Sequence, residues 1–203
     1  DVPIGVFLSG GLDSSSVAAM MKTRPSGPVR SFTIGLEDPS FDESKYARQT
    51  ADLLGTEHFE ERIDERTVLD LMPNIGDILD EPLGDSSLVP TYLVSKFARK
   101  HIKVALGGDG GDELFAGYST LQAHQMAQGL NRLPSFLTKR LLPSVVNRMP
   151  VSINNISLDF RLKRFVDGLT FPPEVRHHRW LGSFTPEEKA SLFTSQMRQE
   201  MTG

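Results

Sequence analysis

The sequence contains no cysteine and no long apolar run. A chain without cysteine forms no disulfide, holds no metal through a thiolate and offers no cysteine nucleophile. Its apolar runs all fall well short of the roughly 20 residues that a membrane-spanning helix needs. We therefore expect no membrane partner and no thiol chemistry within this chain.

An excess of positive charge is also missing. Lysine and arginine number 22 against 26 aspartate and glutamate residues, which gives a net charge of −4. Proteins that bind nucleic acids usually have an excess of basic residues, so no nucleic-acid partner is expected. With 203 residues, 38% of them hydrophobic, the chain can bury the core of one domain with an appendage. Because it opens on Asp1 and already has a core-strand pattern there, we expect it to be part of a longer protein.

A glycine loop follows the first apolar run, residues 4–8. It has the sequence Ser9-Gly10-Gly11-Leu12-Asp13-Ser14-Ser15, and a helical apolar pattern comes after it. Two glycines let successive backbone N–H groups point at an anion, and a helix N-terminus favours the same negative charge. The carboxylate of Asp13 would repel a bare polyphosphate. The pattern therefore predicts a nucleotide bound together with a divalent cation.

The common nucleotide motifs do not match this loop. A Walker A motif needs Gly-Lys followed by Ser or Thr, and no lysine precedes Lys22. The dinucleotide fingerprint needs three spaced glycines. The loop instead resembles the PP-loop, Ser-Gly-Gly-x-Asp-Ser, of enzymes that split ATP into AMP and pyrophosphate. The alternative interpretation is an ordinary glycine turn capped by aspartate or serine.

A second glycine-rich stretch follows another apolar run, residues 102–106. Its sequence is Gly107-Gly108-Asp109-Gly110-Gly111-Asp112-Glu113-Leu114-Phe115-Ala116-Gly117-Tyr118. Three carboxylates so close together repel one another unless a cation, a cationic substrate or helix N-terminal amides lie beside them. A glycine turn with solvated acids and an N-capping Asp112 is the alternative interpretation.

Strand and helix patterns alternate over the first part of the chain. Strands are predicted at residues 4–8, 29–36, 58–63 and 102–106, with helical patterns between them. This alternation predicts an α/β fold with a doubly wound parallel sheet, whose ligands bind beyond the carboxyl ends of the strands. From residue 119 onward only helical patterns separated by prolines remain. We predict an ATP-binding core, 1–118, and a helical extension, 119–203.

Together the two loops resemble the synthetase domain of glutamine-dependent asparagine synthetases, a PP-loop family. Further markers of the resemblance are Ser31-Phe32-Thr33-Ile34-Gly35-Leu36 and Asp80-Glu81-Pro82. The resemblance implies that ATP activates the side-chain carboxylate of aspartate as an adenylate, releasing pyrophosphate, and that ammonia then displaces AMP. It implies ATP and Mg²⁺ as cofactors and a cytoplasmic location. It leaves homo-oligomerisation open.

The resemblance also assigns roles to residues of both loops. Pyrophosphate would be held by Ser9, Gly10, Gly11, Asp13 and Ser14, and magnesium by Asp13 and Asp112. The adenosine pocket would be lined by Leu8, Ile34, Gly107 and Gly108. Asp109 stands where well-known members carry a glutamate that is important for forming the adenylate, so we take Asp109 as the catalytic residue, with a reach shorter by about an ångström.

Two departures from the family pattern bear on partners. The glutaminase half, with its N-terminal cysteine, is absent, so ammonia would come from a domain outside this chain. The lysine-bearing stretch that the family has later in this domain finds no match before Gly203. Three functions stay open. The first is asparagine synthesis or a related reaction on another carboxylate, such as that of a β-lactam synthetase or a PP-loop amidotransferase; the second is a different PP-loop reaction, such as NAD or GMP synthesis or tRNA modification; the third is a non-catalytic nucleotide-binding module.

Asp85-Ser86-Ser87 precedes a predicted helix and permits two interpretations. Its polar groups could face the amino-acid substrate, or they could form an ordinary helix cap.

Overall fold

The computed structural model describes residues 2–23, 27–81, 83–130, 133–152, 157–182, 184 and 186–201. The chain divides into two compact units, which we call the sheet unit, residues 1–115, and the helical unit, residues 116–203. The domain boundary placed after residue 118 stays a prediction.

The sheet unit contains four parallel strands in the order β3-β2-β1-β4. The strands are β1 (Ile4–Phe7), β2 (Arg30–Leu36), β3 (Glu57–Ile63) and β4 (Val104–Leu106). The last strand is shorter than predicted because the Ile102 N–H donates to the Ala98 carbonyl at the end of the preceding helix, 2.9 Å away. The chain therefore joins the sheet only at Val104.

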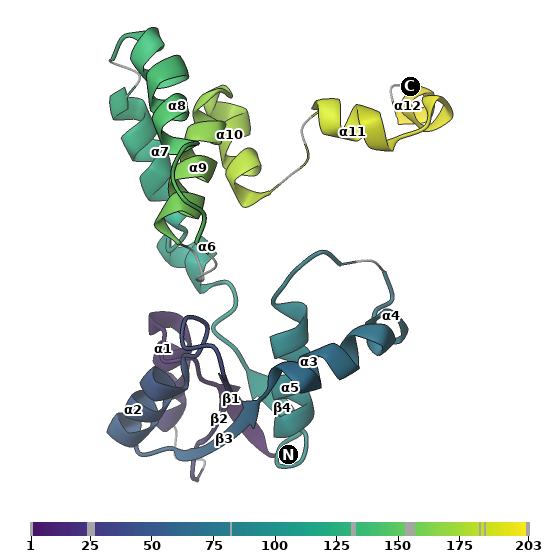
Figure 1. Ribbon diagram of the computed structural model, residues 1–203. Coiled ribbons are helices and arrows are strands. Elements are labelled where there is room, and N and C mark those ends of the chain that lie inside the picture. The colour runs from purple at the N-terminus through teal and green to yellow at the C-terminus, as the bar shows by residue number, and fades with distance from the viewer. Residues whose placement is uncertain are drawn as a thin grey trace. The chain divides into compact units, whose positions relative to one another are not determined.

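Helices cover both faces of this sheet (Figure 1). One face carries α1 (Leu12–Lys22) and α2 (Ser44–Leu54), and the other carries α5 (Leu88–Ala98). The remaining elements of the unit are short: α3 (Glu65–Leu71), η1 (Met72–Asn74), α4 (Ile75–Ile78) and α6 (Gly111–Phe115). A parallel sheet with flanking helices confirms the predicted α/β fold.

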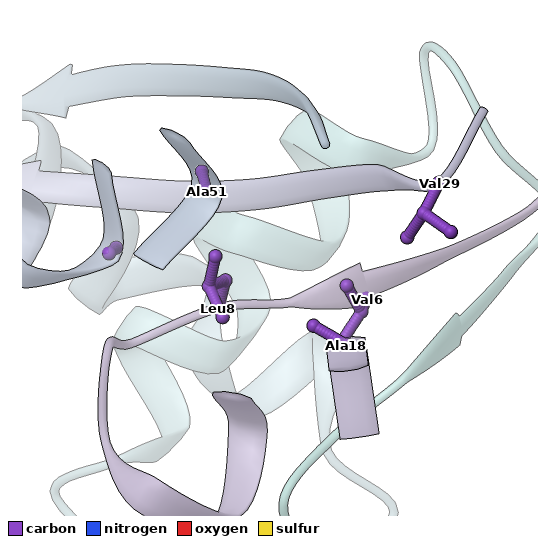
Figure 2. Close-up of a cluster of buried hydrophobic side chains, with 6 residues drawn as sticks. Val6, Leu8, Ala18, Val29 and Ala51 are labelled. Carbon is purple, nitrogen blue, oxygen red and sulfur yellow. The ribbon is translucent and has the colours of Figure 1, made fainter. Parts of the chain in front are cut away.

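Alternating side chains of β1 supply the cores on the two faces. Val6 and Leu8 point toward α1 and α2, where they pack with Ala18, Val29, Ala47 and Ala51 (Figure 2). Phe7 points the other way, toward a cluster of Phe32, Phe97, Ala98 and Ile102. Within that cluster the ring of Phe32 stacks on Phe59 with centroids 5.2 Å apart. Burial of these apolar side chains holds the strand that leads into the first glycine loop in place.

Local capping explains where the helices begin and end. Gly55 ends α2 in the left-handed conformation, with φ of 63°. Asp64 caps α3 by accepting a hydrogen bond from the Thr67 N–H, 2.8 Å away. Gly55 thus ends the helix between β2 and β3, and Asp64 begins the helix that follows β3.

The described residues of the helical unit include helices and no strand, as the sequence predicts. The elements are α7 (Ser119–Leu130), the π-helical η2 (Leu137–Leu141), α8 (Leu142–Val146), α9 (Leu158–Leu169), α10 (Pro173–Leu181), α11 (Pro186–Leu192) and α12 (Ser195–Met201). Trp180 of α10 is buried and stacks on Phe165 of α9 with centroids 5.7 Å apart. Over the residues that the structure describes, none of the helices is long and apolar enough to cross a membrane.

Candidate active site

The first loop, residues 9–15, joins the carboxyl end of β1 to the start of α1. Gly10 has φ of +80°, which favours glycine, and a Cβ built on it would lie 2.6 Å from the Ala47 nitrogen. The loop therefore rests against the first turn of α2. Gly11 is the N-cap of α1 and has no side chain, so the first N–H groups of that helix have no side-chain cap.

Hydrogen bonds of two serine hydroxyls within the first loop stabilise its conformation. Ser9 Oγ accepts from the Gly11 N–H at 3.1 Å, and Ser9 and Ser14 share a hydroxyl hydrogen bond of 2.9 Å. Ser14 Oγ also accepts from the Ser9 N–H at 3.2 Å and lies 3.3 Å from the Gly11 carbonyl oxygen. Because Ser14 is only 7% exposed, its hydroxyl is turned into the loop.

The loop's support on α2 depends in turn on Asp42. Its Oδ1 accepts from the Ser44 N–H at 3.0 Å and from the Leu36 N–H at 3.4 Å, which ties the start of α2 to the end of β2. Burial acts to raise the pKa of Asp42, but the hydrogen bonds from Ser44 and Leu36 outweigh it, and the pKa lies below its ordinary value. Asp42 is therefore an anion at neutral pH.

The second loop, residues 107–113, leaves β4 and leads into α6. Gly110 has φ of +85°, and the Gly111 N–H donates to the Gly108 carbonyl at 3.1 Å. The carboxylate of Asp109 folds back over the Cα of Gly107. The side chains of Asp109 and Asp112 are exposed, so they are accessible to a ligand or a cation.

The two loops are in direct contact. A Cβ on Gly108 would lie 2.8 Å from the Ser14 nitrogen, and a Cβ on Gly111 would lie 2.6 Å from Asp13 Oδ1. Neither distance is compatible with a real side chain, so glycine at both positions lets the second loop close onto the start of α1. The carboxylate of Asp13 thus lies against Gly111, the residue directly before Asp112.

Oxygen ligands suited to magnesium are present where the loops meet. Within the described ranges no three His, Cys, Asp or Glu side chains are gathered into a metal-binding group. Magnesium at a nucleotide, however, is usually held by one or two carboxylates together with phosphate oxygens and water. The carboxylates of Asp13 and Asp112, on adjoining segments, fit that requirement. The metal roles of these two residues stay predictions.

The residues predicted to line the adenosine pocket differ in what they expose. Leu8 is 2% exposed, its side chain packs in the core, and its N–H donates to the Phe32 carbonyl at 2.9 Å (Figure 2). The Leu8 side chain is therefore not accessible to a ligand, and this residue could line a pocket only through its main chain. Ile34, Gly107 and Gly108 are half-buried at the carboxyl edge of the sheet, so they retain accessible surface. The roles of all four stay predictions.

Asp85 stabilises the turn that precedes α5. Its Oδ1 accepts from the Ser87 N–H at 2.8 Å, and hydrogen bonds from the backbone and side chain of Ser87 lower the pKa of this carboxylate. Ser87 is the N-cap of α5 and makes no side-chain capping hydrogen bond, so the segment is a local turn before the helix, and its capping and substrate-facing interpretations both stay predictions.

Sequence reasoning missed the part played by Thr33. Its side chain is 5% exposed, and its hydroxyl donates to the carbonyl oxygen of Leu8, directly before the first loop. The available signal was the hydroxyl pair Ser31 and Thr33, which by strand alternation lie on one face of β2.

A cavity of about 600 Å³ lies elsewhere in the sheet unit. It is bounded by α5 and by strands β1 and β4, and its lining includes Phe7, Tyr92, Lys96 and Ala105. None of the predicted site residues lines it, so it is separate from the glycine loops.

The parallel sheet and the loop between β1 and α1 define the chain's sheet unit as a nucleotide-binding α/β fold of the PP-loop class. Comparison with known families agrees with this class. The family model described as asparagine synthase matches residues 1–199. The chain belongs to the asparagine synthase family.

Individual relatives are similar over most of this chain. It is 41% identical over 167 residues to a protein named putative glutamine-hydrolysing asparagine synthetase 2 of Methanocaldococcus jannaschii, covering 80% of this chain and 31% of that protein. It is 40% identical over 159 residues to glutamine-hydrolysing asparagine synthetase 1 of Bacillus subtilis, covering 78% of this chain and 25% of that protein. The chain thus spans between a quarter and a third of the length of these relatives.

A more distant relative has a different name. The chain is 30% identical over 154 residues to a protein named amidase chry2 of Gibberella zeae, covering 68% of this chain and 23% of that protein. Similarity to this chain therefore extends to proteins that are not named as asparagine synthetases.

Proposed function

We propose that this chain is the ATP-using part of an enzyme that forms an amide on the side-chain carboxylate of aspartate. The observation that carries the proposal is the contact between the loops, in which Gly108 and Gly111 lie against Asp13 and Ser14. That contact places a set of backbone N–H groups and a pair of carboxylates at the same edge of the sheet, where ligands of such folds bind. Family membership supports the same reaction class.

The chemistry follows from the low reactivity of a carboxylate toward amines. One carboxylate oxygen attacks the α-phosphorus of ATP, the bond from that phosphorus to the bridging oxygen breaks, and pyrophosphate leaves. Ammonia then attacks the acyl carbon, the acyl carbon–oxygen bond breaks, AMP leaves with that oxygen, and the nitrogen gives up a proton. Charge develops on phosphate oxygens in the first step, so fixed donors and cations there accelerate the reaction.

Each loop has its own part in this proposal. The Gly10 N–H and the Ser9 hydroxyl, which the Gly11 N–H holds in place, would bind the pyrophosphate portion, in a loop whose shape Ser14 maintains. Asp13 and Asp112 would hold Mg²⁺. When bound, the ion would neutralise phosphate charge and orient the leaving group. The exposed Asp109 would face the reacting carboxylate and the α-phosphate.

The nitrogen source lies outside this chain in the proposal. Glutamine hydrolysis in this family uses a cysteine nucleophile, and the sequence has no cysteine. Ammonia would therefore reach the site from a glutaminase domain elsewhere in the protein.

A second candidate is the same chemistry on a different carboxylate. The similarity to a protein named as an amidase supports this second candidate, because relatives of this chain differ in the reaction for which they are named. In this proposal the first loop would bind phosphate groups of ATP, which the reaction with any carboxylate shares, so that loop would not select aspartate.

Pyrophosphate release separates these functions. The protein, in the form in which the cell makes it, is supplied with MgATP, ammonia and either aspartate or another carboxylic acid. Release that depends on aspartate, with asparagine and AMP in equal amounts, is the expected result. Release with a different acid only would assign the second candidate. MgATP binding without any pyrophosphate release would reject both and leave a nucleotide-binding module.

A further inference from the structure

Two buried hydroxyls hold the peptide that leads into the first loop. The peptide joins Leu8 to Ser9. Its carbonyl oxygen accepts a hydrogen bond from the Thr33 hydroxyl of β2, and its N–H donates to Ser14 Oγ of α1, 3.2 Å away. Because a trans peptide directs its carbonyl and its N–H to opposite sides, the two hydroxyls hold the peptide plane from both sides.

Both hydroxyls are shielded from water. Thr33 is 5% exposed and Ser14 is 7% exposed. Buried polar groups without a partner are costly, so the Leu8 carbonyl and the Ser9 N–H depend on these two side chains once the sheet has formed. The rotation of this peptide about the chain is thereby restricted at the point where β1 ends.

The orientation of this peptide determines how the rest of the loop is arranged. Ser9 follows it directly, and the Ser9 hydroxyl accepts from the Gly11 N–H at 3.1 Å. Gly10 between them has φ of +80° and is packed on the first turn of α2. A rotated peptide would move Ser9 Oγ and redirect the N–H groups of Gly10 and Gly11 together.

We propose that Thr33 is a positioning residue for ATP, acting through the Leu8–Ser9 peptide, and that Ser14 is its counterpart on the other side. This inference rests on the proposed function, in which the first loop binds the pyrophosphate portion of ATP. The Thr33 hydroxyl is buried and donates to the Leu8 carbonyl, so Thr33 would shape the loop and would not itself bind the nucleotide phosphates.

The test compares Thr33→Val with Thr33→Ser and Ser31→Ala. Valine keeps the β-branched shape of threonine and removes the hydroxyl, whereas serine retains it. Ser31 is a matched control because it lies on the same face of β2, is fully buried, and bonds to Thr56 at 2.8 Å and to His58 at 2.9 Å, away from the loop.

We expect Thr33→Val to lower kcat/KM for MgATP on the order of tenfold or more and to leave the KM for the carboxylate substrate near its original value. Thr33→Ser should restore most of the loss. Ser31→Ala should destabilise the fold to a similar extent, measured by thermal melting, and leave kcat/KM for MgATP within about twofold. A merely structural role for Thr33 would make the valine and alanine variants behave alike.

A double-mutant comparison tests whether the two hydroxyls act on one peptide. Ser14→Ala alone should lower kcat/KM for MgATP, and combining it with Thr33→Val should cost less than the product of the two single losses, because the peptide has already been released. Independent, multiplying losses would overturn the shared mechanism.

The outcomes separate this inference from the proposed function. Wild-type protein that neither binds MgATP nor releases pyrophosphate would overturn the proposed function, and this inference with it. Wild-type activity that Thr33→Val retains in full would overturn this inference alone. Amide hydrogen exchange provides a readout independent of activity: faster exchange at Ser9 and Gly11 is expected in Thr33→Val and not in Ser31→Ala.

Discussion

The two glycine loops of the sheet unit contain similar residues but are held in different ways. In the first loop, hydroxyls of Ser9 and Ser14 bond to the loop's own backbone, and Gly10 is packed on α2. In the second loop, Asp109 and Asp112 are exposed, and the α6 that follows has no buried residue. Internal hydrogen bonds and packing thus fix the conformation of the first loop, whereas the second loop presents carboxylates that are accessible to solvent.

This difference indicates a division of labour. Preorganised donors stabilise developing charge without reorganising during the reaction, which suits the first loop to the pyrophosphate portion. Exposed carboxylates can accept a cation or a substrate that arrives later, which suits the second loop to the metal and to the adenylation step. Contact through Gly108 and Gly111 joins the two parts.

The largest effect is expected from neutralising the carboxylates where the loops meet. Asp13→Asn and Asp112→Asn keep the side-chain shape and remove the charge, so each should lower kcat/KM for MgATP on the order of 10³-fold. Magnesium should also lose its contribution to thermal stabilisation by ATP, measured in melts with and without the ion. Asp77→Asn, an exposed acid in α4, is the control and should match wild type. Unchanged magnesium dependence in Asp13→Asn would remove the metal assignment.

Separating the loops should have the next largest effect. In Gly111→Ala the new methyl group needs space beside Asp13 Oδ1, where an ideal Cβ would lie 2.6 Å away. We expect MgATP affinity to fall on the order of 10²-fold, measured by calorimetry, because a displacement of about an ångström is enough for such a loss. In Gly76→Ala nothing lies within 4 Å of the new methyl group, so affinity should be unchanged. Wild-type affinity in Gly111→Ala would mean that the contact is dispensable.

A smaller effect is expected at Asp109. Asp109 is exposed and, unlike Asp13 and Asp112, is not assigned to hold the metal ion, so Asp109→Asn should lower kcat for pyrophosphate release by only about tenfold, with little change in MgATP affinity. Asp109→Glu restores the charge with a longer reach and should recover most of the rate. If kcat is the same in the asparagine variant as in wild type, the catalytic residue of the second loop lies elsewhere.

The smallest effect is a pH dependence at the opposite edge of the sheet. His58 of β3 bonds through Nδ1 to the Ser31 hydroxyl at 2.9 Å, and burial lowers its pKa from the ordinary 6.5. The unfolded chain then takes up this proton at a higher pH than the folded chain. The His58 contribution to stability is therefore full above pH 6.5 and is lost as the pH falls toward the folded pKa.

His58→Asn removes this titration. The melting temperature of wild type should drop more between pH 7.5 and 5 than that of the variant, by about a few degrees. MgATP affinity should be the same in both at neutral pH, because His58 lies near the amino ends of the strands. Parallel pH profiles for the two proteins would show that His58 does not contribute.

Much of the fold was predictable because its signals are local. The apolar run at residues 4–8 marked β1, and the strand patterns at residues 29–36 and 58–63 located β2 and β3. The end of β4 was also located, but its start was placed two residues early, because Ile102 satisfies its N–H on α5 rather than in the sheet. Where a backbone group finds its partner depends on neighbours that periodicity does not reveal.

The site was predictable in composition and less so in its internal contacts. Glycine and aspartate spacing identified both loops, because glycine favours the positive φ found at Gly10 and Gly110 and because carboxylates are side chains that bind magnesium at a nucleotide. Thr33 was not identified, because a threonine in a strand is ordinary by propensity. Its importance lies in a hydrogen bond to Leu8, which is distant in sequence.

The order of residues in the chain thus determined which elements form and which segments carry glycine and charge, since these depend on neighbours along the backbone. Only the packing of β1, β2 and β4 side by side decided that Gly111 meets Asp13 and that Thr33 bonds to Leu8. Contacts of that kind arise when strands separated by whole crossovers end at one edge of a sheet, and their distances depend on how the helices fill the space between.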